Sequence, residues 1–250
     1  MRPGTPVQQL LVAQSMGKWF GTTQVLKNAT LWCNPGRVTV LIGRNGCGKS
    51  TLINVTLGLR RPDYGLVRMG DWATEYPQAA ELVSRGVCYS PQQGMLIPKF
   101  TIRHHLRMFV DRYGGDPEEA ARRVGIGHVL DQRPNQVSGG EKKRAEMALV
   151  LIRRPTVLLA DEPLAGLPPA ERESLGELLR DLAASGTSVV LTGHDAPELF
   201  GLADEITWMS AGTTHQLGSP REALLHDQFV REYLGPGRKT AVQAQLDLQG

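Results

Sequence analysis

The sequence has few cysteines, and they are far apart. Cys33, Cys47 and Cys88 form an odd set without a C-x-x-C pair. This spacing argues against both a disulfide framework and a zinc site. Cys33 and Cys88 lie in apolar stretches and are best explained as small core residues.

The sequence also lacks long apolar runs and a strong charge imbalance. No stretch of about eighteen uninterrupted apolar residues occurs, and the first ten residues, MRPGTPVQQL, have no signal-peptide core. We therefore expect a cytosolic polypeptide that does not itself cross a membrane. With 28 basic and 25 acidic residues, the formal net charge of +3 does not indicate a nucleic-acid partner. The 250 residues suffice for one large α/β domain or two small ones.

The stretch Val38–Thr51 carries the clearest motif in the chain. Residues Val38–Ile42 predict a buried strand, and Gly43–Ser50 follows in the spacing G-x-x-x-x-G-K-S. In such a loop, backbone N–H groups converge on a phosphate, the lysine approaches the outer phosphates and the serine offers a hydroxyl to Mg²⁺. An accidental glycine-rich turn is the alternative. The candidate phosphate-binding residues are Gly43, Asn45, Gly46, Cys47, Gly48, Lys49, Ser50 and Thr51.

Cys47 lies inside this loop, where converging N–H groups would favour its thiolate form. It is either a redox-sensitive residue or one that fills a position for a small side chain.

Two further motifs carry groups suited to the same chemistry. An apolar strand ends in Asp161 and Glu162, where an acid can hold the Mg²⁺ shell and its neighbour can polarise a water, although acids also end strands by chance. Ser138, Gly139 and Gly140 begin a helix, where free N–H groups form a second anion site. Ser138 and Glu141 also fit an ordinary capping box, and both interpretations hold together.

The rest of the chain alternates strands with helices, apart from one helical segment. Residues Thr101–Arg154 predict a separate helical lobe. Trp19 and Phe20 fall in a predicted loop, Gly17–Gly21, where they either stack on a base or cap the sheet. Residues Gly235–Gly250 show no clear apolar period, so we expect a flexible or loosely docked tail. Other expected elements include a helix over 76–85, a strand pair at 205–209 and 213–217, and a helix over 220–233.

Taken in order, these motifs resemble an ATP-binding-cassette (ABC) ATPase over roughly Leu10–Gly235. The resemblance rests on an aromatic residue at Phe20, Walker A at Gly43–Thr51, a Q-loop at Gln92, the signature at Ser138–Gly140, Walker B ending at Asp161-Glu162 and an H-loop at His194. It implies an α/β fold with a P-loop NTPase core, consisting of a mixed sheet with an antiparallel β subdomain, and an inserted α-helical subdomain. We expect a single domain, 1–250, with the catalytic core in 1–100 and 155–234 and the helical subdomain in 101–154.

The resemblance also implies a role for each motif residue. Phe20 would stack on adenine, and Lys49, Ser50 and Thr51 would bind phosphates and Mg²⁺. Gln92 would contact Mg²⁺ and the attacking water, with Glu162 as general base and His194 as γ-phosphate sensor. His194 could otherwise be a buried structural histidine. Asp161, Ser50 and Gln92 are the candidate metal ligands.

Ser138, Gly139 and Gly140 would bind the ATP held by a second cassette, in a head-to-tail homodimer or heterodimer. One departure stands out, because Pro168 occupies a position where many members carry Asp. Proline has neither an N–H nor a carboxylate, so we expect slow but real hydrolysis.

The expected partners are integral membrane transporter subunits, with the chain peripheral on the cytoplasmic face of the cell membrane. The apolar segment Met95–Phe100 would dock on them, or it packs between lobes. DEPLAGL at 161–167 and FVREYLG at 229–235 resemble the cassettes of branched-chain amino-acid import and lipopolysaccharide export. The alternatives are a soluble assembly ATPase, similar to iron–sulfur scaffold cassettes, or a degenerate cassette that binds ATP without turnover.

Overall fold

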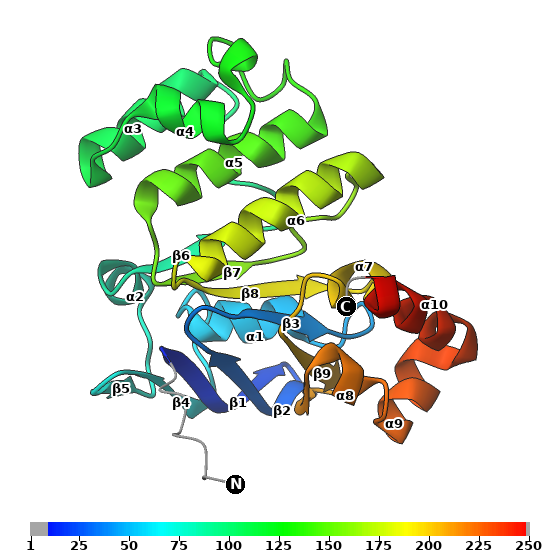
Figure 1. The fold of residues 1–250 in the computed structure, drawn as a ribbon. Helices are drawn as coiled ribbons and strands as arrows, with labels where there is room; N and C mark the ends of the chain where they lie inside the picture. Colours follow the sequence, from blue (N-terminus) through cyan, green and yellow to red (C-terminus); the bar gives the residue numbers. More distant parts are fainter. Residues whose placement is uncertain (1–9, 249–250) are drawn as a thin grey trace, which may run out of the picture.

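The computed structural model describes residues 10–248. The expected lack of a signal peptide rests largely on residues 1–9, which lie outside the described residues, as do residues 249–250. Within the described range, strands form one ten-stranded sheet in the order β5-β4-β1-β2-β10-β9-β3-β8-β7-β6 (Figure 1). The strands are β1 (Leu11–Phe20), β2 (Thr23–Cys33), β3 (Val38–Ile42), β4 (Tyr64–Met69), β5 (Trp72–Thr74), β6 (Val87–Ser90), β7 (Val157–Ala160), β8 (Ser188–Gly193), β9 (Glu205–Ser210) and β10 (Thr213–Gly218).

The sheet combines a parallel half with an antiparallel half. Strand β3 pairs in parallel with β8 and β9, while β7 joins β8 and β6 joins β7 in the same direction. Strands β1, β2, β4 and β5 pair antiparallel. The expected mixed α/β fold with an antiparallel part is therefore confirmed.

Helices cover the sheet and form a lobe beside it. They are α1 (Lys49–Thr56), α2 (Ala79–Ser84), α3 (Ile102–Tyr113), α4 (Pro117–Arg123), η1 (Gly127–Val129), α5 (Gly139–Arg153), α6 (Pro169–Ala184), α7 (Ala196–Phe200), α8 (Pro220–Ala223), α9 (Asp227–Phe229), the π-helical turn η2 (Val230–Leu234) and α10 (Gly235–Leu248). Helices α3, α4 and α5 stand apart from the strands in Figure 1 and correspond to the expected helical lobe. Within residues 10–248, no helix combines the length and hydropathy needed to cross a bilayer.

Helix α1 packs between the two halves of the sheet (Figure 1). Its Leu52 and Ile53 are fully buried in a cluster that also contains Leu26 of β2 and Leu41 of β3. Burying a side chain of this size stabilises the fold by about 1.5–3 kcal/mol, so α1 is held firmly behind the loop that precedes it. All five residues of β3 are buried, as their apolar run predicts.

Several local expectations are wrong in detail. Strand β1 continues to Phe20, so no loop spans Gly17–Gly21. Pairing with β4 reaches Gly17, and pairing with β2 extends the strand from there to Phe20. The expected helix over 76–85 shortens to α2, and the expected helix over 220–233 divides into α8, α9 and η2. The strand pair β9 and β10 forms as expected, in antiparallel register.

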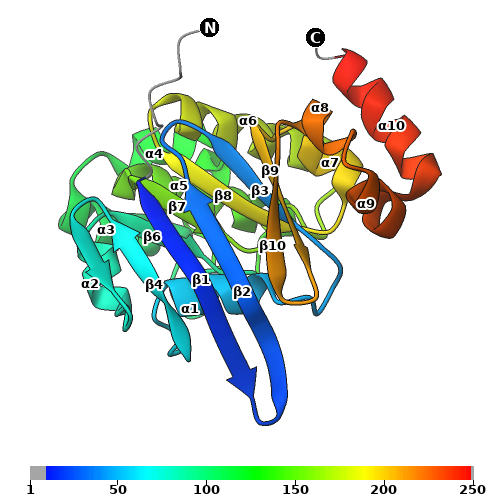
Figure 2. The same ribbon diagram turned by 90° about the horizontal axis from the view of Figure 1, so that it is seen from below.

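The expectation of a flexible tail is wrong for residues 235–248. They form α10, which lies alongside α7 in both ribbon views (Figures 1 and 2). Val242 and Leu246 are buried and join the main core cluster. Two apolar residues spaced four apart thus supply the tertiary contact that holds an otherwise polar helix.

Candidate active site

The glycine-rich loop connects β3 to α1 and curls around the lysine that follows it. Lys49 is 5 % exposed, and its Nζ donates to the carbonyl oxygens of Gly43 (2.8 Å) and Arg44 (3.2 Å). Gly48 has a φ of 114°, a conformation that favours glycine, and a Cβ there would lie 2.7 Å from the Met209 Cε atom. The loop thus requires glycine at this position, and it holds the lysine at the N-terminal end of α1.

Two acids follow β7, and one hydroxyl of β8 contacts both. The Thr192 Oγ1 donates to the Asp161 Oδ1 and accepts from the Glu162 backbone N–H at 2.9 Å. Thr192 is 1 % exposed and Asp161 4 %, so the bond between them is shielded from water, while the bond from Glu162 is partly buried. Glu162 has a φ of +48°, unusual for a side chain with a Cβ, and such strain is often found at functional sites. Strand pairing between β7 and β8 therefore fixes the position of both acids.

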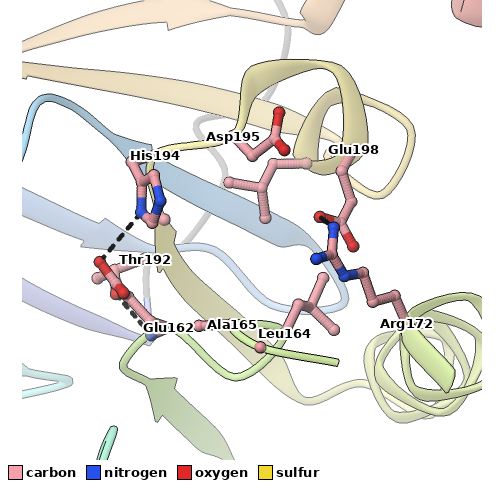
Figure 3. Close-up of a pocket in the computed structure, with 11 residues that line it drawn as sticks. Glu162, Leu164, Ala165, Arg172, Thr192, His194, Asp195 and Glu198 are labelled. Carbon is pink, nitrogen blue, oxygen red and sulfur yellow. Dashed lines mark hydrogen bonds and ion pairs between the residues drawn. The ribbon is translucent and has the colours of Figure 1, made fainter. Parts of the chain in front are cut away.

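Glu162 is the centre of a polar cluster from three loops. The Gln92 Nε2 donates to its Oε2 at 3.1 Å, and the His194 Nδ1 lies 3.5 Å from its Oε1. Figure 3 shows His194 directed toward Glu162, with Thr192 beside them. His194 is 51 % exposed in its side chain, so the alternative of a buried structural histidine is wrong. The fold thus brings together three residues that are up to 102 positions apart in sequence (194 minus 92).

Asp161 influences a neighbouring phenol as well. Burial and the nearby Asp161 carboxylate raise the pKa of Tyr89 to about 12. This phenol therefore stays protonated and neutral beside the acids over the physiological pH range.

The loop after Glu162 is tied to the segment after His194. The Arg172 side chain, from α6, donates through Nε to the Leu167 carbonyl and through Nη1 to the Glu198 Oε2 at 2.9 Å. Figure 3 shows Arg172 and Glu198 on the side of the pocket opposite Glu162 and His194. This pocket of about 120 Å³ is lined by residues of both loops, including Glu162, Leu164, His194 and Glu198. Burial raises the pKa of Glu198, and Arg172 opposes that shift.

Pro168 immediately precedes α6, and Pro169 is the first residue of that helix. The φ of Pro168 is −61°, which the proline ring favours. A proline at position 168 is therefore compatible with the local backbone, and the neighbouring Leu167 carbonyl accepts a hydrogen bond from the Arg172 side chain.

The signature residues do not approach the glycine-rich loop of the same chain. Ser138 caps α5 in the helical lobe, and both bonds of a capping box with Glu141 are present. Ser138 and Gly139 are exposed, and among residues 10–248 no hydrogen bond or ion pair links 138–140 to 43–51. Gly140 faces α6, where a Cβ would collide with the Glu171 carboxylate.

Phe20 lies at the end of β1, in the hairpin that projects from the sheet (Figure 2). Its ring is 40 % exposed, and the Arg60 Cζ and Lys18 Nζ atoms lie 5.5 Å and 5.9 Å from its centroid. Trp19 instead packs edge-on against Tyr64. The two aromatics are similarly exposed, Trp19 at 38 % and Phe20 at 40 %, and they differ in their neighbours, since cations flank only the Phe20 ring among the contacts of this pair in the described residues.

The segment Met95–Phe100 is partly buried and partly exposed. Leu96 is buried and Met95 packs against the core, whereas Ile97 is 47 % exposed. The Met95 N–H donates to the buried Glu146 carboxylate of α5, which ties the segment to the helix that starts at the signature.

The expected thiolate at Cys47 is not favoured. Burial raises the pKa of the Cys47 thiol above its ordinary value, against smaller opposing effects from Lys49 and from backbone N–H groups. Burial also raises the pKa values of the Cys33 and Cys88 thiols, as expected for core residues.

Sequence reasoning did not identify Thr192, Arg172 or Glu198 as parts of the site. Thr192 carried a signal, since it is a polar residue near the end of an apolar strand, two positions before His194. Arg172 and Glu198 carried none, because charged residues on helices are common.

Comparison with known proteins gives consistent results. Residues 26–165 match the protein family described as "ABC transporter". The chain is 31 % identical over 217 residues to the Fe(3+) ions import ATP-binding protein FbpC 2 of Rhodococcus jostii, covering 85 % of this chain and 63 % of that protein. It is 26 % identical over 234 residues to the lipopolysaccharide export system ATP-binding protein LptB of Haemophilus influenzae, covering 90 % and 97 %. The chain thus spans less than two thirds of the FbpC 2 protein but nearly all of LptB.

Solved structures share the fold. A crystal structure of the ADP conformation of MJ1267, an ATP-binding cassette of an ABC transporter, aligns with a TM-score of 0.80 at 24 % identity, covering 90 % of this chain and 98 % of that one. A nucleotide-free ATP-binding cassette aligns with a TM-score of 0.79. The resemblance to lipopolysaccharide-export cassettes is confirmed by the LptB match.

Proposed function

The chain belongs to the ABC transporter family of ATP-binding proteins, and on that basis we propose that it hydrolyses ATP to drive conformational change in separate membrane subunits. The observation that carries the proposal is the cluster around Glu162, which combines a carboxylate, the Gln92 amide and the His194 ring at the ends of parallel strands. This arrangement suits a water that attacks a terminal phosphate.

Each site residue then has a distinct role. Glu162 is the general base, and Gln92 orients the water through the bond geometry it already has with Glu162. His194 contacts the γ-phosphate, and Lys49 neutralises the outer phosphates once ATP displaces the loop carbonyls as its partners. Phe20, with its open face, stacks on the adenine.

The donor set fits Mg²⁺. Ser50 at the start of α1, Asp161 and Gln92 supply hydroxyl, carboxylate and amide oxygens, the hard ligands this ion prefers. Asp161 is buried, and its Oδ1 is engaged by Thr192, which orients the carboxylate. When bound, Mg²⁺ neutralises charge on the phosphates.

We further propose that the complete site contains two chains. The exposed residues Ser138 and Gly139, together with the backbone of Gly140, which is buried against α6, bind the ATP of a second cassette in a head-to-tail homodimer or heterodimer. Integral membrane subunits dock near Ile97 and the helical lobe, so that the chain lies on the cytoplasmic face of the cell membrane. Pro168 removes one cross-subunit contact, and hydrolysis is correspondingly slow.

The test is Glu162→Gln, which removes the base and keeps the side-chain shape. We expect the variant to lose ATPase activity and to elute as a dimer in Mg²⁺-ATP, while the wild type turns over and remains largely monomeric. Glu177→Gln, at an exposed position of α6, is the matched control and should behave as wild type. Equal dimerisation of wild type and Glu162→Gln would favour a degenerate cassette.

A second measurement tests the membrane partner. Affinity purification of the tagged chain from detergent-solubilised membranes should recover integral membrane proteins. Recovery of soluble partners alone would overturn the transport proposal in favour of an assembly ATPase.

A further inference from the structure

The C-terminal segment Asp227–Leu248 packs on the core beside the candidate active site through four buried residues, Phe229, Leu234, Val242 and Leu246. Phe229 is fully buried, stacks on Phe200 of α7 at 6.2 Å and meets Trp208 of β9 edge-on. Figures 1 and 2 show α10 running beside α7, the helix that follows His194. The segment therefore packs on the element that carries the His194 loop.

Two consecutive residues of the π-helical turn η2 reach two different loops of the site. The Tyr233 Oη donates to the His194 carbonyl oxygen at 2.8 Å. The Glu232 carbonyl oxygen accepts a bond of 2.6 Å from the Arg44 Nη2, inside the glycine-rich loop. We call this pair of hydrogen bonds the C-terminal brace. Through Glu232 and Tyr233, it links the loop after β3 to the loop after β8, and Glu232 lies 188 positions downstream of Arg44.

The brace is held rigidly at its own end. The Tyr233 ring stacks on the buried Phe229 at 5.4 Å with an interplanar angle of 20°. Burial raises the pKa of the Tyr233 phenol, so its hydroxyl stays a donor at physiological pH. On the other side, an open pocket of about 270 Å³ lined by Arg44, Cys47 and Tyr233 separates the turn from the loop, so polar bonds rather than close packing make the connection. Single-turn π-helices occur frequently at functional sites.

We propose that Tyr233 and η2 position the His194 loop and the glycine-rich loop relative to each other, and that hydrolysis at this site depends on the brace. The proposal rests on the proposed ATPase function. Tyr233 acts through the His194 backbone, on which the 3.5 Å approach of the imidazole to Glu162 depends. It is a positioning residue and touches neither nucleotide nor water in this scheme.

Tyr233→Phe is the direct test, because it keeps the ring on Phe229 and removes only the hydroxyl. We expect kcat for ATP hydrolysis to fall about three- to tenfold, the effect of one hydrogen bond on the barrier. The KM for ATP should stay within about twofold, because the phosphate-binding loop keeps its contacts. Tyr113→Phe is the matched control: its hydroxyl accepts from Arg153 in the helical lobe, and its loss should leave kcat unchanged.

Hydrogen exchange gives a readout that does not depend on turnover. In Tyr233→Phe, peptides covering residues 193–199 should exchange faster, and those of α3 should not. An unchanged kcat together with unchanged exchange in 193–199 would overturn the proposal. If the wild type itself shows no ATPase activity above Glu162→Gln, the proposed function fails, while the exchange result still decides whether the brace holds the loop.

Discussion

The Thr192 hydroxyl offers the sharpest test of how this site is organised, since one oxygen contacts both acids. It donates to the Asp161 carboxylate and accepts from the Glu162 N–H, within a residue that is 1 % exposed. Thr192→Val keeps the shape of the side chain and removes both bonds. The Glu162 N–H is then left without that acceptor in a partly buried environment.

The expected magnitude follows from those two bonds. A buried polar group left unpaired costs about 1–3 kcal/mol, and a hydrogen bond to a charged group contributes about 1.5–3 kcal/mol. Because the added methyl group regains part of this through burial, we expect a net loss of about 2–4 kcal/mol. For a chain of this length, a loss of about 3 kcal/mol lowers Tm by roughly 6–12 °C.

Thermal unfolding and ATPase assays measure the two consequences. Thr192→Val should show the Tm shift and at least a tenfold loss of kcat, by the order of magnitude expected when catalytic groups lose their orientation. Thr192→Ser keeps the hydroxyl and should restore most of the activity. Thr39→Val on β3 is the matched control, because Thr39 is equally buried but makes only a 3.4 Å contact with Glu205. Equal Tm shifts in the two valine variants, or no rescue by serine, would refute this account.

Two further predictions concern titratable groups. Burial raises the pKa of Glu198 and Arg172 opposes this, so Arg172→Met raises it further. When the pKa of a carboxyl is higher in the folded than in the unfolded protein, the free energy of unfolding falls as the pH rises through the folded pKa. Arg172→Met should therefore lower Tm more at about pH 8 than at about pH 5. Adding Glu198→Gln should abolish the difference, and equal shifts at both pH values would contradict it. Because burial raises the pKa of Cys47, iodoacetamide should modify it more slowly than free cysteine near neutral pH, as followed by mass spectrometry. Full ATPase activity after complete alkylation of Cys47 would contradict the proposal that the loop around this residue binds the phosphates of ATP.

The sequence was most informative where function depends on neighbours in the chain. The glycine-rich loop, the capping box at Ser138 and the acids after β7 are contiguous motifs whose local geometry follows from residue type and spacing. The buried strand β3 was equally clear, because every one of its residues is apolar or small enough for the core. These features pointed to the ABC transporter family before any contact between them was known.

The tertiary structure decided everything that depends on pairing between distant segments. Phe20 falls on a strand because it pairs with Thr23 of β2. Residues 235–248 form a helix because Val242 and Leu246 find a buried surface that composition does not reveal. Thr192 and Tyr233 matter through bonds that span 31 and 39 positions. A strand or loop motif depends on consecutive residues, whereas the hydrogen-bond partner of a hydroxyl depends on which distant segments the fold brings next to it.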